Sequence, residues 1–242
     1  MNASLETIPL INLSLAFIPA VATIIILFKW SLKSTNAIYA VSRMLVQLLL
    51  IGYFLTYIFD SDSAGIVLLI LMVMVFASSW IALGTVLEKR RVLYRHAFVS
   101  ILIGGGLTLL LITQGVLALD PWYSPQSMIP IAGMIFANAM NSVSLAAERL
   151  NAEIERNVSY DMARKIALQS SLIPVINSLF AVGLVSLPGM MTGQILSGVS
   201  PLIAARYQIM VMCMIFGSAG IATAYFLVLV KPVFDRQVVN ET

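Results

Sequence analysis

The feature of this sequence that most constrains its fold is a repeated one: long apolar stretches alternate with short polar connectors. A helix that crosses a lipid bilayer needs about 20 mostly apolar residues. Seven stretches meet this requirement, and their expected limits are 9–28, 38–59, 66–87, 97–119, 129–147, 166–187 and 207–230. The sequence therefore predicts an all-α, polytopic integral membrane protein with about seven transmembrane helices, forming a single transmembrane domain over 1–242.

The composition agrees with a membrane protein. Hydrophobic residues make up 60% of the chain and charged residues only 10%, whereas a soluble domain carries about 25% charged residues. The basic residues lie between the apolar stretches and form no single patch, so we expect membrane lipid and not nucleic acid as a partner. The N-terminus has no basic region, and the first apolar stretch is expected to be a retained span. A single cysteine, Cys213, excludes an internal disulfide.

The basic residues of the connectors predict the orientation of the chain. Twelve of the 14 Lys and Arg residues follow the odd-numbered spans: Lys29, Lys33, Lys89, Arg90, Arg91, Arg95, Arg149, Arg156, Arg164, Lys165, Lys231 and Arg236. The opposite connectors, 60–62 and 120–123, contain none. Because cytoplasmic loops are enriched in Lys and Arg, the sequence predicts an N-terminus outside and a C-terminus inside.

The fifth apolar stretch carries polar side chains on one helical face. Asn138, Asn141, Ser142 and Leu145 are spaced i, i+3, i+4 and i+7. Carboxamides in hydrocarbon are costly without hydrogen-bond partners, so this face is expected to meet other helices or a wet cavity. The stretch then leaves the membrane at Glu148, which is typical of an element that couples two compartments.

Two polar residues also lie one turn apart in the second span, Arg43 and Gln47. Arg43 is only about a turn inside the cytoplasmic boundary, where an arginine can extend to the lipid headgroups. The alternative is a charged gate or a clamp between helices, with Gln47 beside it. Both interpretations are open on the sequence, and we expect the second.

The connector from Glu148 to Lys165 is densely charged and carries an apolar stripe with a four-residue repeat. It is either a solvated amphipathic helix or a docking surface for a cytoplasmic partner, and we expect the latter. The expected coupling residues are Glu148, Arg149, Leu150, Glu153, Ile154, Val158 and Met162.

The sixth span contains Pro174, which should kink or interrupt it. Glycines and prolines between Gly183 and Pro201 then exclude one regular helix. A surface turn is possible here, but a short re-entrant or hinge element is expected, with Pro188 and Gly189 in it. Methionines are frequent in the segment and in the last span. Thioethers bind soft metals such as Cu(I), although methionine is more often a core filler.

Motifs for several enzyme classes are absent from the sequence. There is no G-x-x-x-x-G-K-[ST] for a nucleotide, no G-x-S-x-G for an esterase and no H-E-x-x-H for a protease. Every Asp and Glu is expected in a connector or a terminus, unlike the intramembrane carboxylates of proton-driven transporters. The chain is therefore expected to be a transport subunit and not an enzyme, with no cofactor, and with energy supplied by a separate protein.

Several stretches resemble one family, the FetB-type iron-export permeases of ABC transporters, which includes plant permeases tied to aluminium tolerance. The resemblance is carried by YAVSRMLVQLLLIGYFLTYIF, MIPIAGMIFANAMNSVSL, RYQIMV and, most specifically, GLVSLPGMM. It implies a homodimeric permease that exports a metal and works with a soluble ABC ATPase subunit. It also implies that Arg43, Gln47, Asn138, Met140, Gly183, Leu187, Pro188, Gly189 and Gln208 are functional residues.

The sequence departs from this family at two places. The family usually has an Asp, followed three residues later by a Lys, where this chain has Asn177 and Phe180. It also usually has an S-L-G-A type motif before the sixth span, which this chain lacks. Because a hard cation prefers carboxylate to amide oxygen, no residue is assigned as a metal ligand. The leading hypothesis is an exporter permease for iron or another metal. The alternative is an ATPase-linked permease for an organic solute such as a sugar nucleotide, or a channel.

Overall fold

The structure is a computed structural model that describes residues 8–59 and 63–234 of the chain. Its helices are α1 (Leu10–Leu15), α2 (Phe17–Lys29), α3 (Ser34–Phe59), α4 (Ala64–Ala82), η1 (Leu83–Thr85), η2 (Leu87–Lys89), α5 (Arg90–Leu110), the π-helical η3 (Leu111–Val116), α6 (Pro125–Glu155), α7 (Tyr160–Ala181), α8 (Gly189–Leu196) and α9 (Pro201–Leu229). No strand occurs in these ranges apart from an isolated bridge between Val182 and Ser186. The predicted all-α fold is confirmed.

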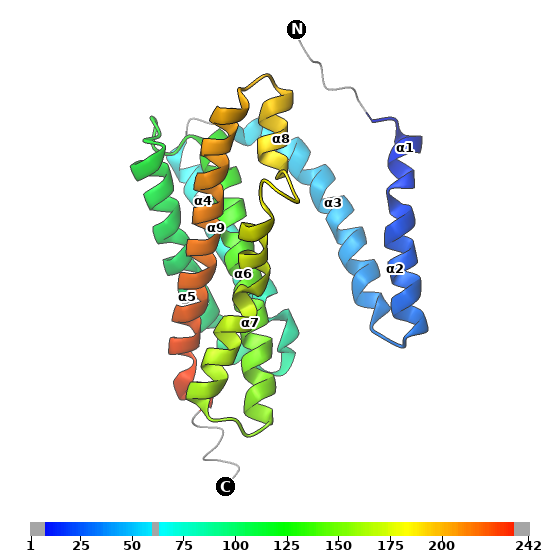
Figure 1. Cartoon of the computed structure of the whole chain (residues 1–242), viewed down its shortest axis with the longest axis vertical. Coiled ribbons are helices and arrows are strands. Elements are labelled where there is room, and N and C mark those ends of the chain that lie inside the picture. Colours follow the sequence, from blue (N-terminus) through cyan, green and yellow to red (C-terminus); the bar gives the residue numbers. More distant parts are fainter. Residues whose placement is uncertain (1–7, 60–62, 235–242) are drawn as a thin grey trace. The chain divides into compact units, whose positions relative to one another are not determined.

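The chain divides into two compact units, 1–61 and 62–242, which are described separately (Figure 1). In the first unit, α2 and α3 contact each other as a helical hairpin. None of its described residues is buried, although its helices are strongly apolar. Such surfaces require lipid or other protein around them. That 1–242 forms a single domain stays a prediction.

Six helical stretches of the described residues are long and apolar enough to cross a membrane. They are Leu10–Lys29, Ser34–Phe59, Ala64–Thr85, Leu87–Val116, Pro125–Glu155 and Pro201–Phe234. Each corresponds to one of the seven predicted spans. The remaining prediction, 166–187, falls on α7, whose first turns carry Asp161, Arg164 and Lys165 and whose last helical residue is Ala181.

Helix α6 is the centre of the second unit, because it packs against α4, α5, α7 and α9. Its buried residues include Ile135, Phe136, Ala139 and Val143. Small residues allow the closest approaches around it. A Cβ atom on Gly104 of α5 would lie 2.5 Å from the backbone nitrogen of Ala222 in α9. The small residue at this position thus allows α5 and α9 to pack closely.

The connector from Glu148 to Lys165 was expected to be one continuous helix, but the structure divides it between two helices. Helix α6 ends at Glu155, and Asn157 takes a left-handed φ of 61°. The amide of Val158 donates to Glu153 O at 3.1 Å, and the amide of Asn157 donates to Ile154 O at 2.9 Å. These two bonds form a Schellman motif, in which Asn is one of the few residues that accept the left-handed position. The motif separates α6 from α7.

The chain is interrupted again between α7 and α8. Helix α7 runs through Pro174 without a break and ends at Ala181, and α8 begins at Gly189 after a turn. Gly183 in this turn has a φ of 83°, which favours glycine. Figure 1 shows α8 following α7 toward the end of the unit where α9 begins. The predicted interruption of the helix before Pro188 is therefore confirmed, and α8 packs on α9.

Candidate transport site

Helices α6, α7, α8 and α9 enclose a cavity of about 400 Å³ in the second unit, which we call the central cavity. Its polar lining consists of two carboxamides from α6, the Gln208 carboxamide from α9, and serine hydroxyls from α6, α7 and the turn before α8. The residues are Asn138, Asn141, Ser142, Ser171, Ser178, Ser186 and Gln208. Methionines and aliphatic side chains complete the wall, among them Met134, Met190 and Met212.

Gln208 is the most unusual residue of this cavity. Its side chain is almost fully buried, with only 5% exposed. Its carbonyl oxygen Oε1 has no hydrogen-bond partner among the described residues. A buried acceptor without a partner costs about 1–3 kcal/mol. The Gln208 Oε1 atom is therefore a free acceptor in the lining of the central cavity.

Other polar groups of the cavity are paired within their own helices. Asn138 Nδ2 donates to Met134 O at 2.8 Å, and Ser178 Oγ donates to Pro174 O at 2.9 Å. Among the described residues there is no group of three or more His, Cys, Asp or Glu side chains that could hold a metal ion. The lining thus offers amide, hydroxyl and thioether groups, all of them uncharged.

The structure brings together six of the predicted pathway residues. Asn138, Asn141, Ser142, Pro188, Gly189 and Gln208 all line the central cavity. Asn177 lies outside this lining, on an exposed face of α7. Arg43 and Gln47 lie one turn apart in α3 of the first unit. Their expected contact with the fifth span stays a prediction, because the two units are described separately.

From α7, the sequence predicted Asn177 as a pathway residue, but it did not identify the α7 residues that line the central cavity. Ser171, Pro174 and Ser178 all line the central cavity. Their spacing of i, i+3 and i+7 is the same signal that singled out the α6 face. Ser171 and Ser178 were overlooked because single serines are common at tight contacts between membrane helices.

A second cavity of about 440 Å³ lies along the N-terminal part of α6 and is called here the end cavity. It is lined by Leu117, Leu119, Gln126, Ser127, Pro130, Ile131, Met134, Met190, Tyr207 and Met210. Its lining includes two residues, Met134 and Met190, that also line the central cavity.

The expected coupling segment is arranged differently from its prediction. Leu150 is fully buried, and Ile154 and Val158 are partly buried and pack against the core, so these three side chains contribute to the fold. Their expected role in coupling stays a prediction. The stripe turns inward because the break at Asn157 folds α7 back along α6, which it contacts. Of the seven predicted coupling residues, Glu148 and Met162 are exposed and Arg149 is half-buried.

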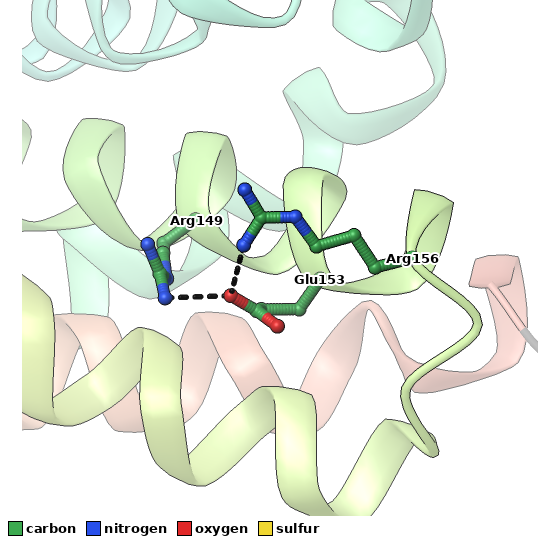
Figure 2. Close-up of polar contacts among 3 residues, drawn as sticks. All are labelled: Arg149, Glu153 and Arg156. Atoms are coloured by element: carbon green, nitrogen blue, oxygen red, sulfur yellow. Dashed lines mark hydrogen bonds and ion pairs between the residues drawn. The ribbon is translucent and has the colours of Figure 1, made fainter.

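Glu153, another predicted coupling residue, is buried among arginines (Figure 2). Its Oε1 lies 2.6 Å from Arg149 Nη2 and 3.3 Å from Arg156 Nη1. All three residues belong to the end of α6 or to its cap. A buried carboxylate held by two guanidinium groups fixes the last turn of the helix, which is a structural role.

A polar groove of about 280 Å³ lies at the same end of the second unit, between η1, η2 and the end of α6. It is lined by Thr85, Val86, Leu87, Glu88, Lys89, Asn151 and Glu155. Lys89 Nζ donates to Asn151 Oδ1 at 2.7 Å, and Asn151 Nδ2 donates to Glu155 Oε1 at 2.7 Å. This groove is a polar concavity, and one of its lining residues is the basic Lys89.

Six membrane-length helices among the described residues define the class of the protein, which is a polytopic integral membrane protein. The comparison with known families is more specific. The family model of the uncharacterised protein family UPF0014 matches residues 10–160 and 156–234. The chain belongs to this family, as the sequence resemblance implied.

The relatives of the chain include proteins with names that state a function. It is 36% identical over 233 residues to the "Probable iron export permease protein FetB" of Escherichia coli, covering 88% of this chain and 86% of that protein. It is 33% identical over 242 residues to "Protein ALUMINUM SENSITIVE 3" of Arabidopsis thaliana, covering 89% and 86%. It is 36% identical over 221 residues to the "UPF0014 membrane protein slr1647" of Synechocystis, covering 82% and 83%. No solved structure matches significantly. The chain is a membrane permease of the UPF0014 family.

Proposed function

We propose that the chain is the transmembrane subunit of an ABC transporter and that its solute passes through the central cavity. The observation that carries this proposal is the buried Gln208 oxygen without a partner, in a cavity lined by uncharged polar groups. A buried acceptor that has no protein partner is costly in a purely structural role. In a permease, the solute can supply this partner.

The proposed topology has seven crossings, with the N-terminus outside and the C-terminus inside. The sixth crossing is α7 continued by α8, interrupted at 182–188. Val182, Ser186 and Pro188 of this interruption line the central cavity. Non-helical backbone at membrane depth is tolerated where it lines a cavity, and broken helices of this kind commonly form solute sites in transporters.

The energy for transport is proposed to come from a separate, soluble ATPase, because the sequence has no phosphate-binding loop. The polar groove of Thr85–Lys89 and Asn151 is the proposed docking site, in place of the buried stripe. Exposed Glu148 and Met162 extend this surface. Helix α6 connects the groove with the central cavity. It carries Asn138 and Asn141 in the lining of the cavity, and Asn151 and Glu155 in the lining of the groove.

The proposed solute is a metal ion, with iron first, and the direction is export. This part of the proposal is supported by the name of the FetB relative. The second candidate is an organic solute such as a sugar nucleotide. It is favoured by the amide and hydroxyl lining of the cavity, because these groups can hydrogen-bond the hydroxyl groups of a sugar, whereas a hard cation prefers carboxylate.

A homodimer in the inner (plasma) membrane of a bacterium is proposed as the working unit. Asn177 on α7 is exposed and lies outside the lining of the central cavity. A carboxamide facing lipid is costly. A second copy that covers this face of α7 would remove Asn177 from lipid.

The experiment that tests the proposed function is reconstitution of the full chain with its candidate ATPase in lipid vesicles. Fe²⁺, other metal ions and sugar nucleotides are screened for stimulated ATP hydrolysis and for movement across the vesicle membrane. The proposal expects at least one metal ion to be moved only when ATP is present. Solute flux without ATP or ATPase would instead identify a channel.

A further inference from the structure

The two cavities of the second unit follow one another along the same helices. On α6, the end cavity is lined by residues from Gln126 to Met134, and the central cavity by residues from Met134 to Leu145. On α9, Tyr207 and Met210 line the end cavity, and the central cavity is lined by residues from Gln208 to Ile215. Both helices therefore place the two cavities in the same order.

The two cavities together have the length of a membrane crossing. Gln126 and Leu145, the outermost lining residues on α6, are 19 positions apart. At about 1.5 Å of rise per residue, this corresponds to about 28 Å of helix. The hydrocarbon core of a bilayer is about 30 Å thick. The pair of cavities thus follows α6 over nearly the whole membrane.

Only Met134 of α6 and Met190 of α8 line both cavities. A side chain that borders two neighbouring cavities lies at the boundary between them. Neither methionine is buried in the core, and Met190 is 36% exposed. A thioether side chain is apolar, unbranched and flexible. It can exclude water in one rotamer and yield to a passing solute in another.

We infer that Met134 and Met190 form an apolar septum in a single transmembrane path that joins the end cavity to the central cavity. The idea that a solute passes through this path rests on the proposed function, but the existence of the septum does not. It also gives these methionines a role other than core filling. Met190 lies in the first turn of α8, after the break between α7 and α8, so a shift of α8 would move Met190 relative to Met134.

The septum can be tested by cysteine accessibility, without any knowledge of the solute. In a chain carrying Cys213→Ala, one cysteine is placed in each cavity on the same helix, Ser127→Cys or Asn141→Cys. A charged, membrane-impermeant thiol reagent is added from one side of the membrane at a time. Ser127→Cys should react from the side of the 120–123 connector, and Asn141→Cys should react at least tenfold more slowly from that side.

Replacing both septum residues, Met134→Ala with Met190→Ala, should raise the rate at Asn141→Cys from the connector side by tenfold or more. The matched control is Met44→Ala with Met72→Ala, because both of these methionines are exposed and line neither cavity. Met134→Leu with Met190→Leu should retain the low rate, since leucine is also apolar and of similar size. Reaction of Ser127→Cys in the alanine background checks that the chain still folds.

An unchanged rate at Asn141→Cys in the alanine variant would overturn the septum, as would a fast rate with the native methionines in place. If the alanine pair does not insert, each single alanine variant carries the same test. The outcome is independent of the proposed function. Vesicles can show a septum while no solute is moved, and a solute can be moved through a path that has no barrier at these two positions.

Discussion

Gly104 shows how strictly one residue can be fixed by helix packing in this fold. Its position leaves 2.5 Å between a built Cβ atom and the nitrogen of Ala222, so any side chain must push α5 away from α9. Gly106 on the same helix has nothing within 4 Å. We expect Gly104→Ala to lower the free energy of unfolding by about 1–3 kcal/mol, and Gly106→Ala to be close to neutral. Thermal unfolding in detergent measures both, and equal melting temperatures would contradict the close contact.

Glu153 gives a second prediction at the scale of single residues. Its loss leaves the guanidinium groups of Arg149 and Arg156 without their common partner. Because both arginines are partly exposed, we expect Glu153→Gln to cost about 1–2 kcal/mol, less than for a fully buried pair. The exposed Glu148 on the same helix, as Glu148→Gln, is the control. Equal stability of the two variants would show that the Glu153 ion pairs contribute nothing.

At the scale of elements, the break between α7 and α8 depends on the left-handed Gly183. A Cβ atom in this conformation costs about 1–2 kcal/mol. We expect Gly183→Ala to lower stability by about this amount and to reduce transport. Gly193→Ala in α8 is the control, since nothing lies within 4 Å of its built Cβ atom. Gly189, which the sequence singled out, also has open space and no left-handed φ. Its replacement by alanine should be tolerated by the backbone.

The elements also show what could be predicted from the sequence. Apolar length located six membrane-length helices, and the i, i+3, i+4 pattern of Asn138, Asn141 and Ser142 located one wall of the cavity. The stripe of Leu150, Ile154 and Val158 was expected to face a partner, whereas these side chains pack into or against the core of the second unit. A helical stripe shows that one side of a helix is covered, but not whether the same chain or a partner covers it. Ser171, Pro174 and Ser178 of α7 also have helical spacing, but this spacing does not specify which helices meet at that face.

At the scale of the whole molecule, the proposed orientation places the 120–123 connector outside. In a chain carrying Cys213→Ala, Ser124→Cys should react with an impermeant thiol reagent added to intact cells. Val92→Cys, which is exposed in the basic connector, should react only after the membrane is opened. The reverse pattern would invert the proposed topology.

Docking of the ATPase is also a property of the whole assembly. If the Thr85–Lys89 groove binds it, the double change Glu88→Lys with Glu155→Lys should reduce co-purification of the ATPase at least tenfold, by charge repulsion or loss of contacts. Asp161→Lys, at an exposed position outside the groove, is the control. Wild-type recovery of the ATPase with the groove variant would exclude this docking site.

The central claim is that solute meets the buried Gln208 oxygen in the central cavity. The most direct test compares Gln208→Leu with Gln194→Leu, measuring ATP-dependent movement of the solute found by reconstitution. Gln194 also has a buried Oε1 without a partner among the described residues, but it lies outside the lining of both cavities. Loss of one partner for the solute costs about 1–3 kcal/mol, so Gln208→Leu should weaken apparent solute affinity about 5- to 150-fold while Gln194→Leu leaves it unchanged. Equal affinity in the two variants would contradict the claim.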